Sequence, residues 1–233
     1  MLAQDNRTGG ISYWQAQDHQ SVADRHGVSL AEYIHALFGL VRQKRAAHIL
    51  MIGCAGGTLA TMLSRAGVQV TLVDIDPLSF QIARRYFHMP KTVDCHAADG
   101  AGFLRRRTAR YDAIILDAFA DEIIPPHLLT DGFFRLVKAR LNRDGLFLIN
   151  IVVRDDEDRT PDKIARAMKK VWRGVRLLDA DGYENRNAVA VGGAVKDLKR
   201  PRLLMRPANG ARALAKSLAQ LSFRPLKRKN IQR

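Results

Sequence analysis

The chain has 233 residues, of which 47% are hydrophobic, so one α/β domain with a full core is the simplest organisation. No apolar run approaches the roughly 20 residues that span a bilayer, and the opening MLAQDNRTGG has no apolar signal-peptide core. The two cysteines, Cys54 and Cys95, give neither a disulfide framework nor a zinc pattern. We therefore expect a cytoplasmic protein with no transmembrane segment and no metal.

The net charge of +15 is concentrated at the end of the chain. Residues 196–233 hold 12 of the 38 Lys and Arg residues and one acid, Asp197, so the first 195 residues carry only +4. Such a basic tail can bind nucleic acid, acidic lipid or an acidic partner through charge. Phe223 is its one aromatic residue, which weakens the case for stacking on single-stranded bases. The preferred alternative is a solvated, partly disordered extension.

Residues 1–47 precede the first clear pattern. Within them, residues 28–42 predict a helix with Tyr33, Leu37 and Phe38 among the apolar residues along one side. We expect residues 1–47 to form a helical segment that covers one face of the sheet or one wall of the site.

Residues 48–76, HILMIGCAGGTLATMLSRAGVQVTLVDID, hold the most informative motif. The run ILMI is apolar without alternation, as in a strand that is covered on both faces. Gly53, Gly56 and Gly57 let the backbone approach a ligand closely, and the helix that follows offers free N–H groups. A second strand, VTLV, ends at Asp74, which is placed to accept hydrogen bonds from ribose hydroxyls. These parts indicate a nucleoside at the carboxyl edge of a parallel sheet.

Strands and helices continue to alternate up to residue 195. Two final strands are separated by only a short loop, and a hairpin there would make one of them antiparallel. The alternation predicts a doubly wound, mostly parallel, Rossmann-like sheet of seven strands, of the class I methyltransferase type, over residues 48–195. The later strands are expected at residues 92–98, 111–119, 146–153, 175–178 and 188–191, and the helices between them at 77–87, 101–107, 130–141 and 160–172.

Four acids stand where strands end, at the edge where open α/β sheets bind ligands. Asp76 is followed by Pro77, so we interpret it as a helix cap. Asp99 could accept a hydrogen bond from an adenine amino group. Asp117 opens the loop DAFADEIIPPHLLT, where an acid could take a proton from an attacking amine or hold a cationic substrate. His127 in the same loop is equally well explained as a base or as an exposed residue without a role.

Several of these motifs resemble the spermidine synthases and related polyamine aminopropyltransferases, in the right order and over roughly residues 21–153. They are ILMIGCAGG, TLVDIDP, AADG, YDAIILDAF and the stretch from Ile124 to Phe134. The resemblance implies a class I methyltransferase fold that takes S-adenosylmethionine or its decarboxylated form as group donor, without a metal. It also implies roles for single residues: a nucleoside-binding turn with Gly53, Ala55, Gly56 and Gly57, ribose contact at Asp74, adenine contact at Asp99 and Gly100, and orientation or deprotonation of the acceptor amine by Asp117.

The resemblance further suggests residues for the acceptor. SVADRHGVSLAEYIHAL is similar to the family segment that precedes the core, which makes Gln20, Tyr33 and His35 candidates for lining the site. Asp121 is the candidate for the second acid of the family's D-x-x-D motif, although it falls one place late. The acceptor is then a small molecule such as a polyamine. A homodimer is a hypothesis, and we expect the chain to lack the long N-terminal strand domain with which many members oligomerise.

Position 55 leaves the transferred group open. The family turn usually reads GGGDGG, and its Asp holds the aminopropyl ammonium group, whereas this chain has Ala55. Loss of one charge-assisted hydrogen bond costs about 1.5–3 kcal/mol. Ala55 thus favours a methyltransferase, whereas the loop acids attract cations and favour an aminopropyltransferase-like enzyme, which is the first hypothesis. A methyltransferase with an unknown acceptor is the second, and a catalytically silent nucleoside-binding protein is the third.

Overall fold

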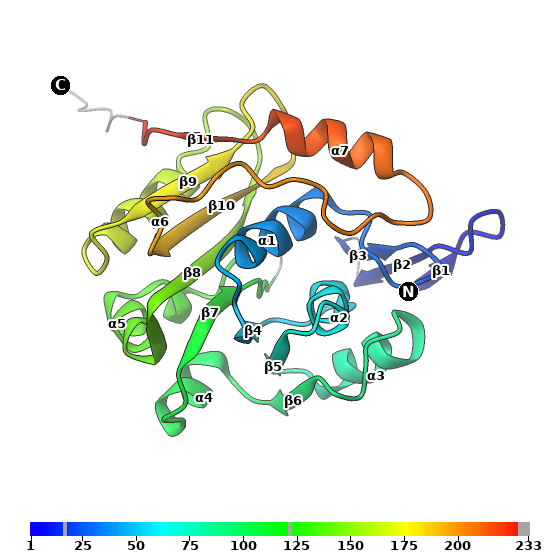
Figure 1. Ribbon diagram of the computed structural model, residues 1–233, viewed down its shortest axis with the longest axis horizontal. Coiled ribbons are helices and arrows are strands. Elements are labelled where there is room, and N and C mark those ends of the chain that lie inside the picture. Colours follow the sequence, from blue (N-terminus) through cyan, green and yellow to red (C-terminus); the bar gives the residue numbers. More distant parts are fainter. Residues whose placement is uncertain (16–17, 121–122, 228–233) are drawn as a thin grey trace.

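Eight strands form the central sheet, in the order β11-β9-β10-β8-β7-β4-β5-β6 (Figure 1). The computed structural model describes residues 1–15, 18–120 and 123–227, with the backbone alone at residues 15 and 18–20. Strands β4 to β8 run parallel, and β10 is antiparallel to both β8 and β9. The strands are β4 (His48–Ile52), β5 (Gln69–Asp74), β6 (Asp94–Ala97), β7 (Tyr111–Leu116), β8 (Leu141–Val153), β9 (Val175–Asp179), β10 (Arg186–Gly193) and β11 (Ser222–Arg224).

Helices cover both faces of this sheet, as the alternation predicts. α1 (Glu32–Gln43), α2 (Thr58–Arg65), α3 (Pro77–Tyr86) and α7 (Ala211–Gln220) pack on one face, and α4 (Gly100–Arg106), α5 (Asp131–Arg140) and α6 (Thr160–Lys169) pack on the other. In β4, Ile49 and Met51 face the first group of helices, while Leu50 and Ile52 face the second. The unbroken apolar run is thus explained by burial on both sides. The fold class predicted from the sequence is confirmed.

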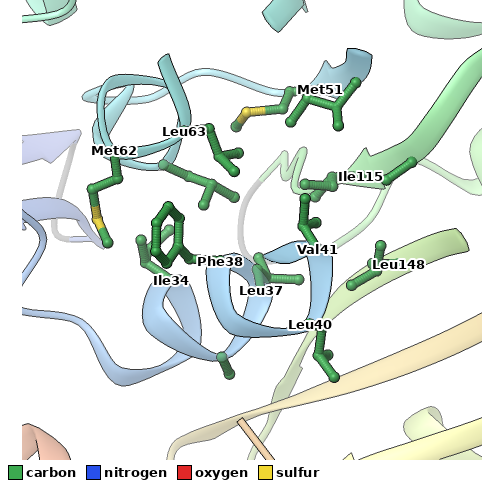
Figure 2. Packing of buried hydrophobic residues seen from close by; sticks show 14 of the residues in the cluster. Ile34, Leu37, Phe38, Leu40, Val41, Met51, Met62, Leu63, Ile115 and Leu148 are labelled. Atoms are coloured by element: carbon green, nitrogen blue, oxygen red, sulfur yellow. The ribbon is translucent and has the colours of Figure 1, made fainter. Parts of the chain in front are cut away.

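The core between α1, α2 and the sheet is shown in Figure 2. Leu37, Phe38 and Val41 of α1 lie against Leu63 of α2 and Ile115 of β7, and all five are at most 3% exposed. Burial of each such side chain contributes about 1.5–3 kcal/mol. This packing holds α1 over the middle of the sheet and so fixes the segment that leads from the N-terminus to the site.

The N-terminal segment differs from the expectation of a helical segment. β1 (Leu2–Gln4), β2 (Ile11–Gln15) and β3 (Asp18–Ala23) form a separate three-stranded antiparallel sheet, and α1 follows it. A turn joins the first two strands, in which the Asp5 carboxylate accepts a hydrogen bond from the Arg7 amide at 2.8 Å and Gly9 has a φ of +68°. Strands this short carry too few residues for a clear alternation of polar and apolar positions, which is why the pattern did not reveal them.

The basic C-terminal segment is part of the fold as far as Lys227, so the expectation of a disordered extension is wrong for its described residues. Residues 198–203 cross α1 so closely that a Cβ at Gly39 would lie 2.8 Å from the Cβ of Pro201. α7 follows, with Leu214 and Leu218 as its buried side chains. β11 then pairs with β9, so the sheet has eight strands where seven were predicted. No helix among the described residues has the length and apolar character of a bilayer span.

Candidate active site

The glycine turn, residues 53–57 between β4 and α2, is shaped by close contacts within the protein. Gly53 has a φ of +101°, and a Cβ there would lie 2.0 Å from the carbonyl oxygen of Asp117. A Cβ at Gly56 would lie 2.7 Å from the Cβ of Ser21, whose hydroxyl accepts a hydrogen bond from the Gly56 amide at 2.9 Å. Gly57 packs in the same way against α3. Glycine is therefore required because neighbouring chain leaves no room for a side chain.

Asp74 ties this turn to the end of β5. Its Oδ2 accepts a hydrogen bond from the Cys54 amide at 2.7 Å, and its Oδ1 accepts one from the Asp76 amide at 2.9 Å. Burial raises the pKa of Asp74, although both hydrogen bonds act in the opposite direction. Ala55, with a φ of +46°, is partly exposed in the turn. The turn therefore offers a carboxylate at position 74 and only a methyl group at position 55.

Asp99 makes two local contacts at the start of α4. Its Oδ1 accepts a hydrogen bond from the Gly102 amide at 2.7 Å, and its Oδ2 lies 2.7 Å from Nε2 of His127. Partial burial acts to raise the pKa of Asp99, but the hydrogen bonds from Gly102 and His127 outweigh it and lower the pKa. Gly100 follows directly, where a Cβ would lie 2.5 Å from a methyl carbon of Ile52. Asp99 and His127 both stay exposed at the sheet edge.

Asp117 directly follows β7, and a hydrogen bond holds one of its carboxylate oxygens in place. Its Oδ1 accepts a hydrogen bond from Nδ2 of Asn150 at 2.8 Å, and Oδ1 of Asn150 accepts one from Nδ2 of Asn187 at 3.0 Å. Asn150 lies on β8 and is 1% exposed. Burial raises the pKa of Asp117 to about 6, although the hydrogen bond from Asn150 acts to lower it. A carboxylate with such a pKa can accept a proton near neutral pH.

The two asparagines were not predicted from the sequence. The signal that points to Asn150 is a single amide inside the apolar run LFLINIVV, because a buried polar side chain needs a partner. Asn187 orients this amide so that its N–H group faces Asp117. The chain of two amides therefore fixes the position of the carboxylate.

A pocket of about 1250 Å³, here called the large pocket, is lined by Asn150, the hydrogen-bond partner of Asp117, although Asp117 itself is not a lining residue. Tyr33 and Asn150 line it, and burial followed by the negative charge of Asp117 raises the pKa of Tyr33. Four distant parts of the chain form most of its walls: residues 21–34, the end of β8, the loop between β9 and β10, and α7. Thr58, at the start of α2, and Phe119 complete the lining. Its charged lining residues carry both signs and are Glu32, Arg154, Asp155, Glu184, Arg186 and Lys216.

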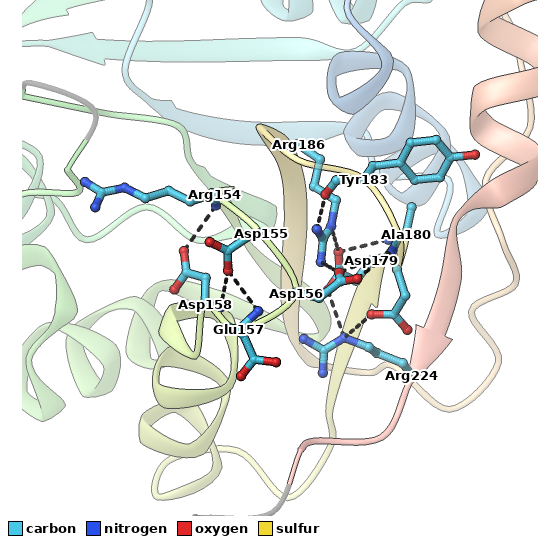
Figure 3. Close-up of polar contacts among 12 residues, drawn as sticks. Arg154, Asp155, Asp156, Glu157, Asp158, Asp179, Ala180, Tyr183, Arg186 and Arg224 are labelled. Atoms are coloured by element: carbon cyan, nitrogen blue, oxygen red, sulfur yellow. Dashed lines mark hydrogen bonds and ion pairs between the residues drawn. The ribbon is translucent and has the colours of Figure 1, made fainter.

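Buried ion pairs hold one wall of the large pocket in place. Figure 3 shows Arg186 and Arg224 converging on Asp179, with nitrogen-to-oxygen distances of 2.9 and 2.8 Å. Arg224, from β11, also contacts the carboxylate of Asp162 on α6 at 2.9 Å, and both acids are fully buried. Arg186 reaches Asp156 at 3.0 Å as well. The C-terminal segment thereby anchors the loop between β9 and β10.

The remaining candidates are placed as follows. His35 is 1% exposed and its Nε2 lies 2.7 Å from the carbonyl oxygen of Ser29, so it joins α1 to the preceding segment and does not line the large pocket. Asp76 accepts a hydrogen bond from the Leu78 amide at 2.9 Å and caps α3, as predicted. Asp121 and the side chain of Gln20 lie outside the described residues.

Known proteins of one family match the part of the chain that holds the glycine turn, Asp74 and Asp117. The spermine/spermidine synthase domain matches residues 30–175. A polyamine aminopropyltransferase from Vibrio vulnificus is 34% identical over 121 residues, which are 49% of this chain and 40% of the relative. An eEF1A lysine and N-terminal methyltransferase homolog from Drosophila melanogaster is 29% identical over 125 residues, 48% of this chain and 19% of the relative. The match thus spans less than half the length of either relative.

The fold is shared with a solved structure over nearly the whole chain. A crystal structure of a probable spermidine synthase from Corynebacterium glutamicum aligns with a TM-score of 0.78 and 19% identity, and covers 97% of this chain and 86% of that one. The family resemblance found in the sequence motifs is confirmed by the domain match, which includes the glycine turn, Asp74, Asp99 and Asp117. The chain belongs to the spermine/spermidine synthase family.

Proposed function

We propose that the chain is a transferase that moves the aminopropyl group of decarboxylated S-adenosylmethionine to an amine, with a polyamine as the class of acceptor. The observation that supports this most directly is Asp117. Its side chain is half-buried and held by Asn150, and its pKa is raised to about 6. Asn150 and Tyr33, which both interact with Asp117, line the large pocket. These are the properties of a group that accepts a proton from a bound amine.

In the proposed reaction the acceptor nitrogen attacks the carbon next to the sulfonium. The new C–N bond forms as the C–S bond breaks, and the bonding electron pair leaves with the neutral thioether. The nitrogen then loses a proton to the Asp117 carboxylate. Because a sulfonium is already a good leaving group, the protein contributes chiefly by positioning the reactants and by removing this proton.

The donor is proposed to lie over the glycine turn. Asp74 keeps lone pairs free for ribose hydroxyls, because Oδ2 accepts a hydrogen bond from the Cys54 amide and Oδ1 accepts one from the Asp76 amide, and each oxygen has two lone pairs. The exposed Asp99, with Gly100 behind it, is placed for the adenine. No side chain projects from Gly53, Gly56 or Gly57, so the donor can approach the backbone of the turn closely. Tyr33 is proposed as a wall of the acceptor side.

Methyl transfer from S-adenosylmethionine is the second candidate, and Ala55 favours it. S-adenosylmethionine carries a carboxylate that its decarboxylated form lacks. A methyl group at position 55 neither repels this carboxylate nor holds the ammonium of the aminopropyl group. The relative from Drosophila is named as a methyltransferase homolog, which also supports this second candidate.

Product analysis separates the two candidates. The full chain is incubated with decarboxylated S-adenosylmethionine and putrescine, and separately with S-adenosylmethionine and a panel of amines and peptides. Release of methylthioadenosine only in the first mixture supports aminopropyl transfer. Release of S-adenosylhomocysteine only in the second overturns it in favour of methyl transfer. Donor binding by calorimetry without product in either mixture overturns both and supports a silent nucleoside-binding protein.

A further inference from the structure

A second cavity lies on the opposite side of α7 from the large pocket. It has a volume of about 590 Å³, and we call it the arginine groove because Arg200, Arg202, Arg206 and Arg212 line it. Its floor is apolar and includes Leu203 and Leu218. α7 separates the two cavities, since Arg212 and Leu218 face the groove while residues 213, 216, 217 and 220 face the large pocket.

The positive charge in this groove is not neutralised by the protein. Arg202, Arg206 and Arg212 are exposed, and none has a carboxylate or other hydrogen-bond partner among the described residues. Arg200 makes one hydrogen bond, to the carbonyl oxygen of Ala219 at 2.7 Å. Residues 198–233 contain no acid at all. Arginine forks bind phosphate groups in two-point contacts, so the groove matches an anion that carries phosphates.

The segment that carries these arginines is held rigidly. The Ala208 amide donates a hydrogen bond to Oδ2 of the buried Asp24 at 2.6 Å. The backbone of Lys199 exchanges two hydrogen bonds with the Gln43 side chain of α1, at 2.8 and 2.9 Å. The arginines therefore stand on a fixed support, and binding does not have to order the backbone first.

An exposed leucine favours a phospholipid surface over nucleic acid as the phosphate-bearing partner. Leu204 lies between Arg202 and Arg206 in the sequence and is 57% exposed. Nucleic acid offers nothing to such a side chain, and the groove has no aromatic residue on which bases could stack. An anionic phospholipid surface uses both features, because phosphates meet the arginines and the leucine enters the apolar boundary.

We propose that the arginine groove and Leu204 form a docking site for a membrane surface rich in anionic phospholipid. The site is independent of the reaction proposed above, because α7 lies between the groove and the large pocket. Each arginine near an anionic surface strengthens binding about fivefold. Three of them together should change vesicle affinity by about a hundredfold.

Vesicle co-sedimentation of the full chain tests this. Vesicles of phosphatidylglycerol and phosphatidylcholine should bind the protein, and vesicles of phosphatidylcholine alone should not. The triple variant Arg202→Gln, Arg206→Gln, Arg212→Gln should bind about a hundredfold more weakly. Leu204→Ser should bind about tenfold more weakly with charge unchanged. The control triple variant Arg105→Gln, Arg135→Gln, Arg143→Gln removes the same charge outside the groove, from exposed positions that have no partner in the described part of the chain, and should bind nearly as well as the parent.

Three results would overturn the proposal. The first is no binding to anionic vesicles in low salt. The second is an equal loss in both triple variants, which would show a general effect of net charge. The third is tighter binding of single-stranded RNA than of vesicles, with the same arginine dependence and no effect of Leu204→Ser, which would show a nucleic-acid site instead. Circular dichroism of each variant verifies that it is folded.

Discussion

The two halves of the candidate site are built in different ways. The glycine turn and Asp74 come from one stretch of chain, residues 53–74, and are held by backbone hydrogen bonds and by neighbours that exclude any side chain. The large pocket gathers walls from segments as far apart as residues 21 and 220. Its loop between β9 and β10 depends on buried ion pairs with Arg224 near the end of the chain.

This difference indicates how the family site can diverge. Under the proposed function, the half that is local in sequence would keep its geometry for the nucleoside while the acceptor side changes with the segments that wall the large pocket. A change of acceptor therefore requires no change in the glycine turn. The following variants test whether the two halves are as separable as the structure implies, and they run from the largest expected effect to the smallest.

Asp117→Asn should lower kcat about 10²- to 10⁴-fold, because the variant cannot accept the proton. Donor affinity should stay nearly unchanged, since the turn does not depend on this charge. In the parent, turnover should rise with pH through about 6, as Asp117 loses its proton. Steady-state kinetics between pH 5 and 8 would show this limb and its loss in the variant. Asp144→Asn, an exposed acid, is the control, and an equal loss there would contradict the assignment.

Arg224→Ala should lower the free energy of unfolding by about 3–5 kcal/mol, because it leaves two fully buried carboxylates, Asp162 and Asp179, without their shared partner. Urea denaturation measures this. Arg143→Ala, at an exposed position, should change stability by less than about 0.5 kcal/mol. If the folded variant still binds the donor but no longer saturates with acceptor, the two halves are separable; loss of both would show that they are coupled.

Gly53→Ala and Gly67→Ala separate backbone strain from collision. Both residues have positive φ, +101° and +79°, but a Cβ at Gly67 would meet nothing within 4 Å. Gly67→Ala should therefore show only the cost of the left-handed backbone, about 1–2 kcal/mol. Gly53→Ala should cost about 1–3 kcal/mol more, because its Cβ collides with the backbone of Asp117. Equal thermal and urea stabilities would contradict the close packing of the turn.

Ala55→Asp should move donor preference toward decarboxylated S-adenosylmethionine by about ten- to a hundredfold, the value of one charge-assisted hydrogen bond. Asp tolerates the positive φ of this position better than most residues. Calorimetric titration with each donor measures the change. Ala55→Asn has the same shape without the charge and should leave the preference nearly unaltered. An unchanged preference in both variants would place the amino-acid part of the donor away from residue 55.

Asp117→Asn should also alter the pH dependence of stability. The pKa of this carboxyl is about 6 in the folded protein and 3.8 in its ordinary state, so folding opposes its ionisation. The stability of the parent should fall as pH rises from about 4 to about 6 and then stay level. Above pH 6 the variant should be more stable by about 3 kcal/mol, and below pH 4 the difference should vanish. Urea midpoints at pH 4 and pH 8 measure this, and a constant difference would contradict the raised pKa.

The sequence alone determined the features whose physical cause is local. An apolar strand, a turn with three glycines and a strand ending in Asp74 lie within one stretch of chain, and the regular alternation that follows is enough for the parallel sheet and its antiparallel hairpin. Asp117 was recognisable because strand ends converge on one edge of such a sheet. The cap made by Asp76 was equally readable from the proline that follows it.

Only the tertiary structure decided the features that join distant residues. The segment from 196 to 227 looked like a solvated tail because nine Lys and Arg residues and only one acid are spread along it. Leu218 and Arg224 find their partners on α1, α6 and β9 only after the sheet has formed. Asn150 and Asn187 likewise become a pair because β8 and β10 are neighbours in the sheet. Contacts between residues far apart in the chain have no local pattern, so the glycine turn and the strand-end acids could be located from the sequence, whereas the two asparagines and the buried ion pairs could not.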